Sequence, residues 1–164
     1  MIATKKNIVK NIIGRINFEN EEIIVAFGSG NAVMTKMILE NIKPKSVLFV
    51  FETNEHSIID LCNINDKRLV IINADAENAK IILKNRYKVE KVDFIISTIP
   101  FTFFERRKKK RIISRSYSLL KEKGKFITTQ YTLLMYRLIK EQFSEISTNP
   151  TVMNMPPVLI EGIK

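Results

Sequence analysis

Five short runs rich in Val, Ile and Phe, with helical segments between them, constrain the fold of this chain more than any other feature of its sequence. The runs occupy residues 23–27, 47–51, 69–72, 92–96 and 125–131. Because they are largely apolar on both faces, they suit parallel strands that are covered by helices on either side. The alternation of such strands with helices predicts βαβ units in a doubly wound sheet.

The pattern changes after Tyr131. Residues 133–142 predict a helix, and residues 143–149 and 152–160 predict two strands with no helix between them. Two such strands indicate an antiparallel hairpin at the edge of the sheet. The sequence therefore predicts one Rossmann-like α/β domain over residues 21–164, mostly parallel with an antiparallel C-terminal edge strand. Residues 1–20 predict an amphipathic helix that packs on this domain or anchors it.

Several function classes are excluded by rare residues and by the length of the apolar runs. Cys62 is the only cysteine and His56 the only histidine, which excludes a disulfide framework and a Cys/His zinc cluster, and we expect no metal site. His56 is expected in the first turn of a helix, with Cys62 packed as a small apolar residue of that helix. The longest uncharged apolar stretch has eleven residues, whereas a spanning helix needs about 20. We expect neither a transmembrane helix nor a secretory signal.

The positive charge is concentrated in two segments. The chain carries a net charge of +10. Residues 1–15 hold four bases and no acid, and residues 105–125 hold ten bases and two acids, so the remainder has a charge of −2. A basic surface on a near-neutral domain indicates a polyanionic partner, either nucleic acid or an anionic membrane.

The second basic segment contains a run of six cations directly after an aromatic patch. Like charges repel along a helix, and cations near its N-terminus oppose its dipole, by about a few tenths of a kcal/mol per contact. The run therefore predicts contact with a partner's phosphates, while the rings could insert at a lipid interface. At least one ring is expected in the core instead. No RNA-reading motif is present, so nucleic acid has less support. The residues concerned are Phe101, Phe103, Phe104, Arg106, Arg107, Lys108, Lys109, Lys110 and Arg111.

Glycines and acids follow the ends of successive predicted strands, where ligands bind in open α/β sheets. After the first strand, two glycines permit a close backbone approach to a ligand. Glu52 ends the second strand, where a carboxylate can accept both ribose hydroxyls, and Asp75 follows the third, where it could accept from an adenine amine. Helix capping is the alternative for either acid alone. The predicted binding residues are Phe27, Gly28, Ser29, Gly30, Asn31, Glu52, Thr53, Asp75, Ala76 and Ser97.

In their order along the chain these motifs resemble the class I S-adenosylmethionine-dependent methyltransferases, and within them the bacterial phospholipid N-methyltransferases. Residues 25–35 resemble the glycine-rich first motif, and residues 97–101 resemble a Ser-Gly-Leu-Pro-Leu turn. Residues 124–131 resemble a Gly-x-Phe strand that ends in Thr-Tyr. Residues 154–158 resemble an Asn-Leu-Pro-Pro-Ala segment, which is the most family-specific of these matches.

The resemblance implies S-adenosylmethionine as cofactor and the amine of a membrane phospholipid or aminolipid as methyl acceptor. Tyr131 is the candidate for orienting that amine, and Thr98 lies in the motif that faces the acceptor. The implied location is the cytoplasm, peripheral to the inner membrane face. The chain departs from the pattern where Ala26 replaces the first motif's acid and Ala32 its third glycine. Two alternatives stay open: an adenine-type RNA methyltransferase, and a non-catalytic domain that binds the cofactor or a membrane.

Overall fold

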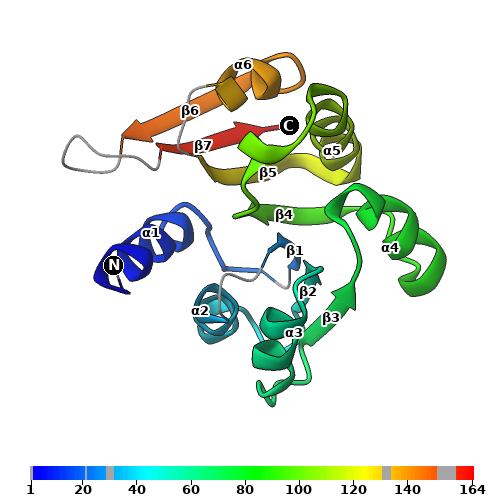
Figure 1. Cartoon of the computed structure of the whole chain (residues 1–164). Coiled ribbons are helices and arrows are strands. Elements are labelled where there is room, and N and C mark those ends of the chain that lie inside the picture. Colours follow the sequence, from blue (N-terminus) through cyan, green and yellow to red (C-terminus); the bar gives the residue numbers. More distant parts are fainter. Residues whose placement is uncertain (1, 21, 29–31, 131–133, 151–157) are drawn as a thin grey trace.

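Seven described strands form a single sheet in the order β3-β2-β1-β4-β5-β7-β6 (Figure 1). The structure is a computed structural model, and it describes residues 2–20, 22–28, 32–130, 134–150 and 158–164. β1 to β5 pair in parallel, and β7 pairs antiparallel with both β5 and β6. The predicted doubly wound, mostly parallel sheet is confirmed. The strands are β1 Ile23–Phe27, β2 Val47–Glu52, β3 Leu69–Asn73, β4 Val92–Ser97, β5 Leu120–Gln130, β6 Glu145–Pro150 and β7 Val158–Ile163.

Helices cover both faces of this sheet, as Figure 1 shows. One face carries α1 Ile2–Ile13, α2 Val33–Asn41 and α3 Glu55–Cys62, and the other carries α4 Ala79–Tyr87, α5 Arg106–Leu119 and α6 Leu134–Lys140. Short 3-10 helices, η1 Ala76–Asn78 and η2 Phe101–Phe103, follow β3 and β4. Each parallel strand therefore leads at its carboxyl end into a turn or a helix at the same edge of the sheet.

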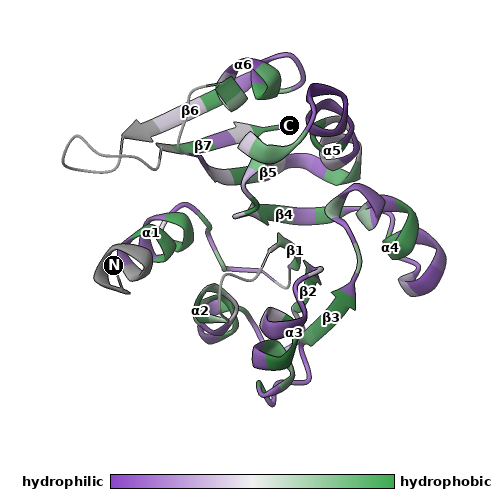
Figure 2. Ribbon diagram, in the orientation of Figure 1, coloured by the Kyte–Doolittle hydropathy of each residue, from purple (hydrophilic) through white to green (hydrophobic). Residues whose placement is uncertain are grey.

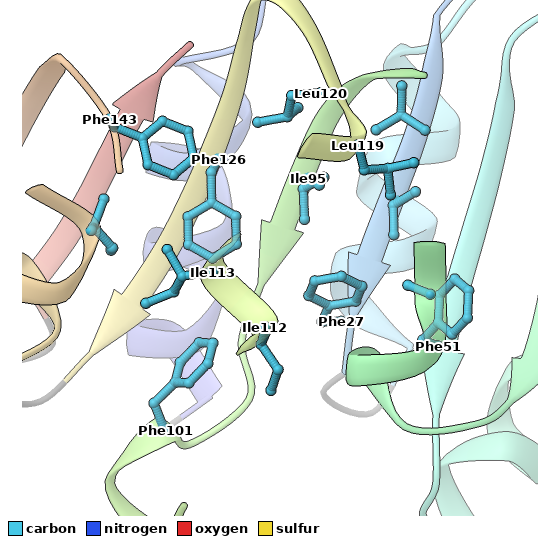
Figure 3. Close-up of a cluster of buried hydrophobic side chains, with 14 of the residues drawn as sticks. Phe27, Phe51, Ile95, Phe101, Ile112, Ile113, Leu119, Leu120, Phe126 and Phe143 are labelled. Atoms are coloured by element: carbon cyan, nitrogen blue, oxygen red, sulfur yellow. The ribbon is translucent and has the colours of Figure 1, made fainter. Parts of the chain in front are cut away.

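The two faces of the sheet hold separate apolar cores, because successive side chains of a strand point to opposite sides. In β1, Val25 and Phe27 belong to the core under α4, α5 and α6, whereas Ile24 and Ala26 belong to the core under α1 and α2. Figure 3 shows the first core, where Phe101 and Phe126 lie beside residues of α5. This two-sided burial is the physical reason for the continuous apolar runs in the sequence.

The C-terminal strand lies one position inside the edge of the sheet. β7 pairs with β5 on one side and with β6 on the other, so β6 is the edge strand. A glycine permits this packing, since a β-carbon on Gly162 would lie 2.7 Å from the ring of Phe143. Phe143 stacks on Phe126 with 6.0 Å between the ring centroids. The antiparallel C-terminal strand is confirmed, and its interior position was not predicted.

The helices that carry most of the two basic segments, α1 and α5, lie on opposite faces of the sheet. The described side chains of α1 pack on α2, with Val9 and Ile12 buried in the core on that face. α5, which is mostly hydrophilic in Figure 2, covers the other face. Arg15 contacts Glu161 at 3.4 Å and Ser147 at 3.0 Å. The described parts of α1 and α5 therefore do not share one face of the sheet.

Helix α3 confirms one expectation about the rare residues and corrects another. His56 is exposed in the first turn, as predicted. Cys62 ends the helix and is exposed rather than packed, because Leu61 is the residue that α3 buries. Within the described segments, no helix is long and apolar enough to cross a membrane, and no group of three or more His, Cys, Asp or Glu side chains could hold a metal ion.

Candidate functional site

The carboxyl ends of β2, β1 and β4 are tied together by backbone hydrogen bonds. The N–H of Gly28 donates to the carbonyl of Phe51 at 2.9 Å, and the N–H of Thr98 donates to the carbonyl of Phe27 at 3.0 Å. β1 and β4 are also the neighbours at which the order of the sheet reverses. Such a switch point is where open α/β sheets form a ligand-binding crevice.

Gly28 occupies a position that no other residue could take without strain. Its φ is +78°, and a β-carbon there would lie 3.2 Å from both Thr98 Oγ1 and Ile99 Cγ2. A glycine at this point brings bare backbone to the crevice. Ser29, Gly30 and Asn31, predicted to continue the loop, lie outside the described residues.

Ala32 marks the start of α2 and has a φ of 62° in the left-handed region. This conformation costs an alanine about 1–2 kcal/mol relative to the right-handed one, and a glycine would adopt it freely. Ala32 stands at the position of the third glycine in the motif that residues 25–35 resemble, and it adopts this conformation without being a glycine. Ala26, in place of the first motif's acid, is completely buried in the core next to α2.

Glu52 is held at the end of β2 by the backbone that follows it. Its Oε1 accepts the N–H groups of Thr53 and Asn54, both at 2.9 Å. Asn54 in turn caps α3 by accepting the N–H of Ser57 at 3.1 Å. The turn from β2 into α3 thereby orients the Glu52 carboxylate at the crevice.

The crevice opens into a depression beyond β1, β2 and β3. It brings together the predicted residues Gly28, Glu52, Thr53, Asp75 and Ala76. The remaining lining residues are Phe51, Ala74, Ile99 and Phe104. Two predicted residues lie beneath it: the ring of Phe27 packs in the core, and Ser97 is completely buried with a hydroxyl that has no hydrogen-bond partner among the described residues.

Asp75 caps η1 and also forms an ion pair with Lys108. Its Oδ1 accepts the N–H of Glu77 at 2.8 Å and caps η1, while Lys108 Nζ donates to its Oδ2 at 2.5 Å. Lys108 Nζ also lies 4.4 Å from the ring centroid of Phe104. Burial raises the pKa of Asp75, but the hydrogen bonds from Lys108 and Glu77 together outweigh it and leave the pKa below its usual value.

We expect the substitution Lys108→Met to raise the pKa of Asp75. The hydrogen bond and the charge of Lys108, which lower this pKa, are lost, while the burial that raises it remains. A depressed pKa in the folded state contributes stability above pH ~4, which is lost as the pH falls through the folded pKa. Loss of Lys108 should therefore lower the stability that Asp75 contributes near neutral pH and reduce the part of the acid destabilisation that comes from this carboxyl. An NMR titration of the Asp75 carboxyl carbon measures this. Lys110→Met is the matched control, since Lys110 binds Glu141 instead; an unchanged Asp75 pKa in Lys108→Met would contradict the pairing.

Acids from other elements partner half of the run of six cations, so not all of them are available to the phosphates of a partner. Lys110 Nζ lies 2.8 Å from Glu141 of α6. Arg111 and Arg115 both bind Glu77 of η1. These contacts offset the repulsion that the sequence alone attributes to the run. Among the described residues, Arg106, Arg107 and Lys109 have no ion-pair partner.

The aromatic patch divides into three different environments. Phe101 has 0% exposure and lies in the core, so the prediction that it contacts a membrane is wrong and the expectation of at least one ring in the core is confirmed. Phe104 packs edge-on against Phe101 at 6.0 Å and lines the depression. Phe103 is 84% exposed. Phe103 is thus the ring that remains available to a partner.

Gln130, at the end of β5, is a positioning residue that the sequence analysis missed. It is buried, and its Nε2 donates to Thr128 Oγ1 at 2.9 Å and to the carbonyl of Ile99 at 3.2 Å. The amide thereby ties the turn after β4 to β5. A polar residue that ends an otherwise buried strand is the sequence signal that could have indicated it. Tyr131, the predicted catalytic residue, follows directly and lies outside the described residues, as do residues 154–157.

Comparisons with known proteins find methyltransferases. No protein-family model matches the chain. The chain is 22% identical over 155 residues to an ornithine lipid N-methyltransferase of Singulisphaera acidiphila, covering 90% of this chain and 78% of that protein.

Solved structures with the same fold include an N-methyltransferase and a pre-rRNA processing protein. The N-methyltransferase NodS of Bradyrhizobium japonicum has a TM-score of 0.74 at 10% identity, covering 97% of this chain and 95% of that one. The fibrillarin pre-rRNA processing protein of Methanococcus jannaschii has a TM-score of 0.67 at 15% identity, covering 90% and 68%. These likenesses confirm the fold predicted from the sequence.

Proposed function

We propose that this chain, a class I methyltransferase by its fold and similar in sequence to a lipid N-methyltransferase, transfers the methyl group of S-adenosylmethionine to the amine of a membrane lipid. The observation that carries the proposal is the depression at the carboxyl ends of β1, β2 and β3. It combines a bare backbone at Gly28 with two carboxylates, Glu52 and Asp75. The sequence similarity to an ornithine lipid N-methyltransferase supports the lipid acceptor.

The residues of the depression fit an adenosyl group. Gly28 leaves space that a β-carbon would fill, and Glu52 presents a carboxylate for the two ribose hydroxyls. Asp75 would accept from an adenine amine, in competition with Lys108. S-adenosylmethionine, when bound, supplies a methyl group on a positively charged sulfur. An ordered carboxylate and a pre-formed turn contribute mainly by positioning.

The acceptor amine must arrive without its extra proton, because an ammonium has no lone pair. Thr98 Oγ1 donates to the carbonyl of Gly28 at 3.3 Å, which leaves the lone pairs of its oxygen to accept an N–H of the acceptor. The turn that carries Thr98 is fixed by Gln130. Tyr131 is the proposed residue for holding the amine, through its hydroxyl or through its ring.

We expect Tyr131→Phe to lower the methylation rate severalfold while cofactor affinity stays within twofold, since only the hydroxyl is lost. Tyr131→Ala should be slower still, because the ring is lost as well. Methyl incorporation from labelled S-adenosylmethionine into aminolipid vesicles measures the rate, and calorimetry measures cofactor binding. Equal activity of the parent and Tyr131→Ala would remove Tyr131 from the mechanism and leave the substrate class untouched.

Association with a membrane surface is part of the same proposal. Phe103 and Leu134 are large apolar side chains with 84% and 56% exposure; Phe103 ends η2 after β4, and Leu134 begins α6 after β5. Arg106 and Arg107 are exposed cations close to Phe103 in the chain. Exposed apolar side chains beside unpaired cations suit an anionic lipid interface. The protein would act as a peripheral enzyme at that surface.

An RNA acceptor is the second candidate, because the structural neighbours include a pre-rRNA processing protein. The same assay decides between them when total RNA and aminolipid vesicles are offered separately. Methylation of RNA alone would overturn the lipid acceptor. Cofactor binding without methylation of either substrate would favour the non-catalytic alternative.

A further inference from the structure

A second depression lies between α5 and α6, apart from the one beside Gly28. It has a volume of about 220 Å³ and is lined by Arg106, Lys109, Leu134, Arg137, Leu138 and Glu141. A water molecule's share of liquid volume is about 30 Å³, so the space accommodates a small charged group with part of the molecule that carries it. None of the sequence motifs pointed to this combination of α5 and α6.

Lys109 is the unusual residue of this depression. It is only 7% exposed, and it has no hydrogen-bond or ion-pair partner for its ammonium among the described residues. Its neighbours on α5 differ, since Lys108 binds Asp75 and Lys110 binds Glu141. Its long apolar stem carries this burial, while its ammonium remains accessible to solvent. The structure therefore places a cation without an ion-pair partner beside a space that an anion could enter.

The surroundings of Lys109 reinforce the positive charge. Arg106 lies one turn earlier on the same face of α5, where its charge also helps to lower the pKa of Glu141, and Arg137 comes from α6. Glu141, the acid of the lining, is bound by Lys110 at 2.8 Å. The depression is also close to the N-terminus of α5, a helix of 14 residues whose dipole favours a negative charge there. Three cations thus face the space and one acid is already partnered.

The second depression is lined by helices that begin at the edge of the sheet where the first depression lies. α5 follows β4 and α6 follows β5, so both helices begin at the carboxyl edge of the sheet where Gly28 and Thr98 lie. Lys108 points to Asp75 of the first depression, whereas Lys109, the next residue, lines the second. The first turns of α5 therefore stand between the two depressions. Leu134 and Leu138 add apolar surface, and Leu134 is exposed.

We propose that Lys109, with Arg106 and Arg137, binds the acid group of the acceptor lipid, a carboxylate or a phosphate, while the amine of the same lipid reaches Thr98. This rests on the proposed function. The apolar side chains of Leu134 and Leu138 would contact the adjoining part of the lipid. Charge-assisted hydrogen bonds to a group that is removed from water are strong and geometrically selective. The site would favour zwitterionic aminolipids over simple amines that lack an acid group.

The substitution Lys109→Met tests the proposal, because it removes the charge and nearly keeps the volume. We expect KM for aminolipid vesicles to rise at least tenfold, with kcat within threefold of the parent and cofactor affinity unchanged. Lys109→Arg should restore most of the loss. Lys140→Met is the matched control, since Lys140 is an exposed lysine at the end of α6 that does not line the depression. Thermal unfolding of all variants checks that they fold.

A titration with inorganic phosphate provides a readout besides activity. The Nζ resonance of Lys109 in the parent should shift with phosphate, and the shifts of other residues around the depression should disappear in Lys109→Met. Phosphate binding without any effect on KM for lipid would show a site for free phosphate and overturn the acceptor role. An unchanged KM in an active, folded Lys109→Met would likewise overturn it while leaving the proposed function intact.

Failure of the proposed function has a different signature. In that case the parent methylates no aminolipid at all, and the acceptor role of Lys109 falls with it. The phosphate titration then still decides about the site. Binding that requires Lys109 would support an anion site in this depression, and the absence of binding would overturn it.

Discussion

We expect Phe101→Ala to lower the free energy of unfolding by about 3–5 kcal/mol, the usual cost of truncating a fully buried Phe. Phe101 has 0% exposure and packs edge-on against Phe104 at 6.0 Å. It lies in the core beneath α5, close to Ile112 and Ile113 (Figure 3). A cavity there would also loosen the turn that carries Thr98. Urea denaturation monitored by circular dichroism measures the loss.

Phe103→Ala is the matched control for Phe101→Ala, and we expect it to leave stability unchanged while it weakens membrane binding. The ring is 84% exposed, so stability should stay within about 0.5 kcal/mol of the parent. Cosedimentation with anionic vesicles should nevertheless weaken, because the proposed membrane contact is lost. A stable Phe101→Ala would contradict the core assignment. Unchanged vesicle binding by Phe103→Ala would contradict the proposed membrane surface.

We expect Glu52→Gln to weaken the binding of S-adenosylmethionine by about 10- to 100-fold, which corresponds to about 1–3 kcal/mol. The amide keeps an oxygen for the N–H groups of Thr53 and Asn54, so the turn into α3 should persist. What is lost is the charge that strengthens hydrogen bonds from the ribose hydroxyls. Calorimetric titration with the cofactor measures the change in affinity.

Glu55→Gln is the control for this measurement. Glu55 is an exposed acid in the first turn of α3, three residues after Glu52, and it does not line the depression. Its substitution changes the net charge equally and should leave cofactor affinity within twofold. Equal affinity of the parent and a folded Glu52→Gln would remove Glu52 from the cofactor site.

The elements and the edge of the sheet that carries the site could be predicted because their signals are local. Apolar runs of five or six residues, such as β1 and β2, reflect burial on both faces. Parallel strands bring their carboxyl ends to one edge, so Gly28, Glu52 and Asp75 were expected together from their places after successive strands. The depression that they line agrees with this expectation.

The partners of individual side chains could not be predicted. Lys108 and Asp75 are 33 positions apart, and Arg111 and Glu77 are 34 apart. A run of cations has the same local pattern whether acids of η1 and α6 face it or a phosphate surface does. The same limit applies to Phe101 and Phe103, two residues apart in one short helix, of which the turn buries one ring and exposes the other.

By itself, the sequence determined the class of fold and the edge of the sheet at which ligands bind, because periodic burial and strand order follow from short-range patterns. Only the tertiary structure decided that β7 lies between β5 and β6, that half of the basic run is neutralised within the molecule, and that Lys109 lines a depression between α5 and α6. Each of these depends on contacts between elements distant in the chain. The free energy of such contacts arises from burial and charge in three dimensions, which local sequence patterns do not record.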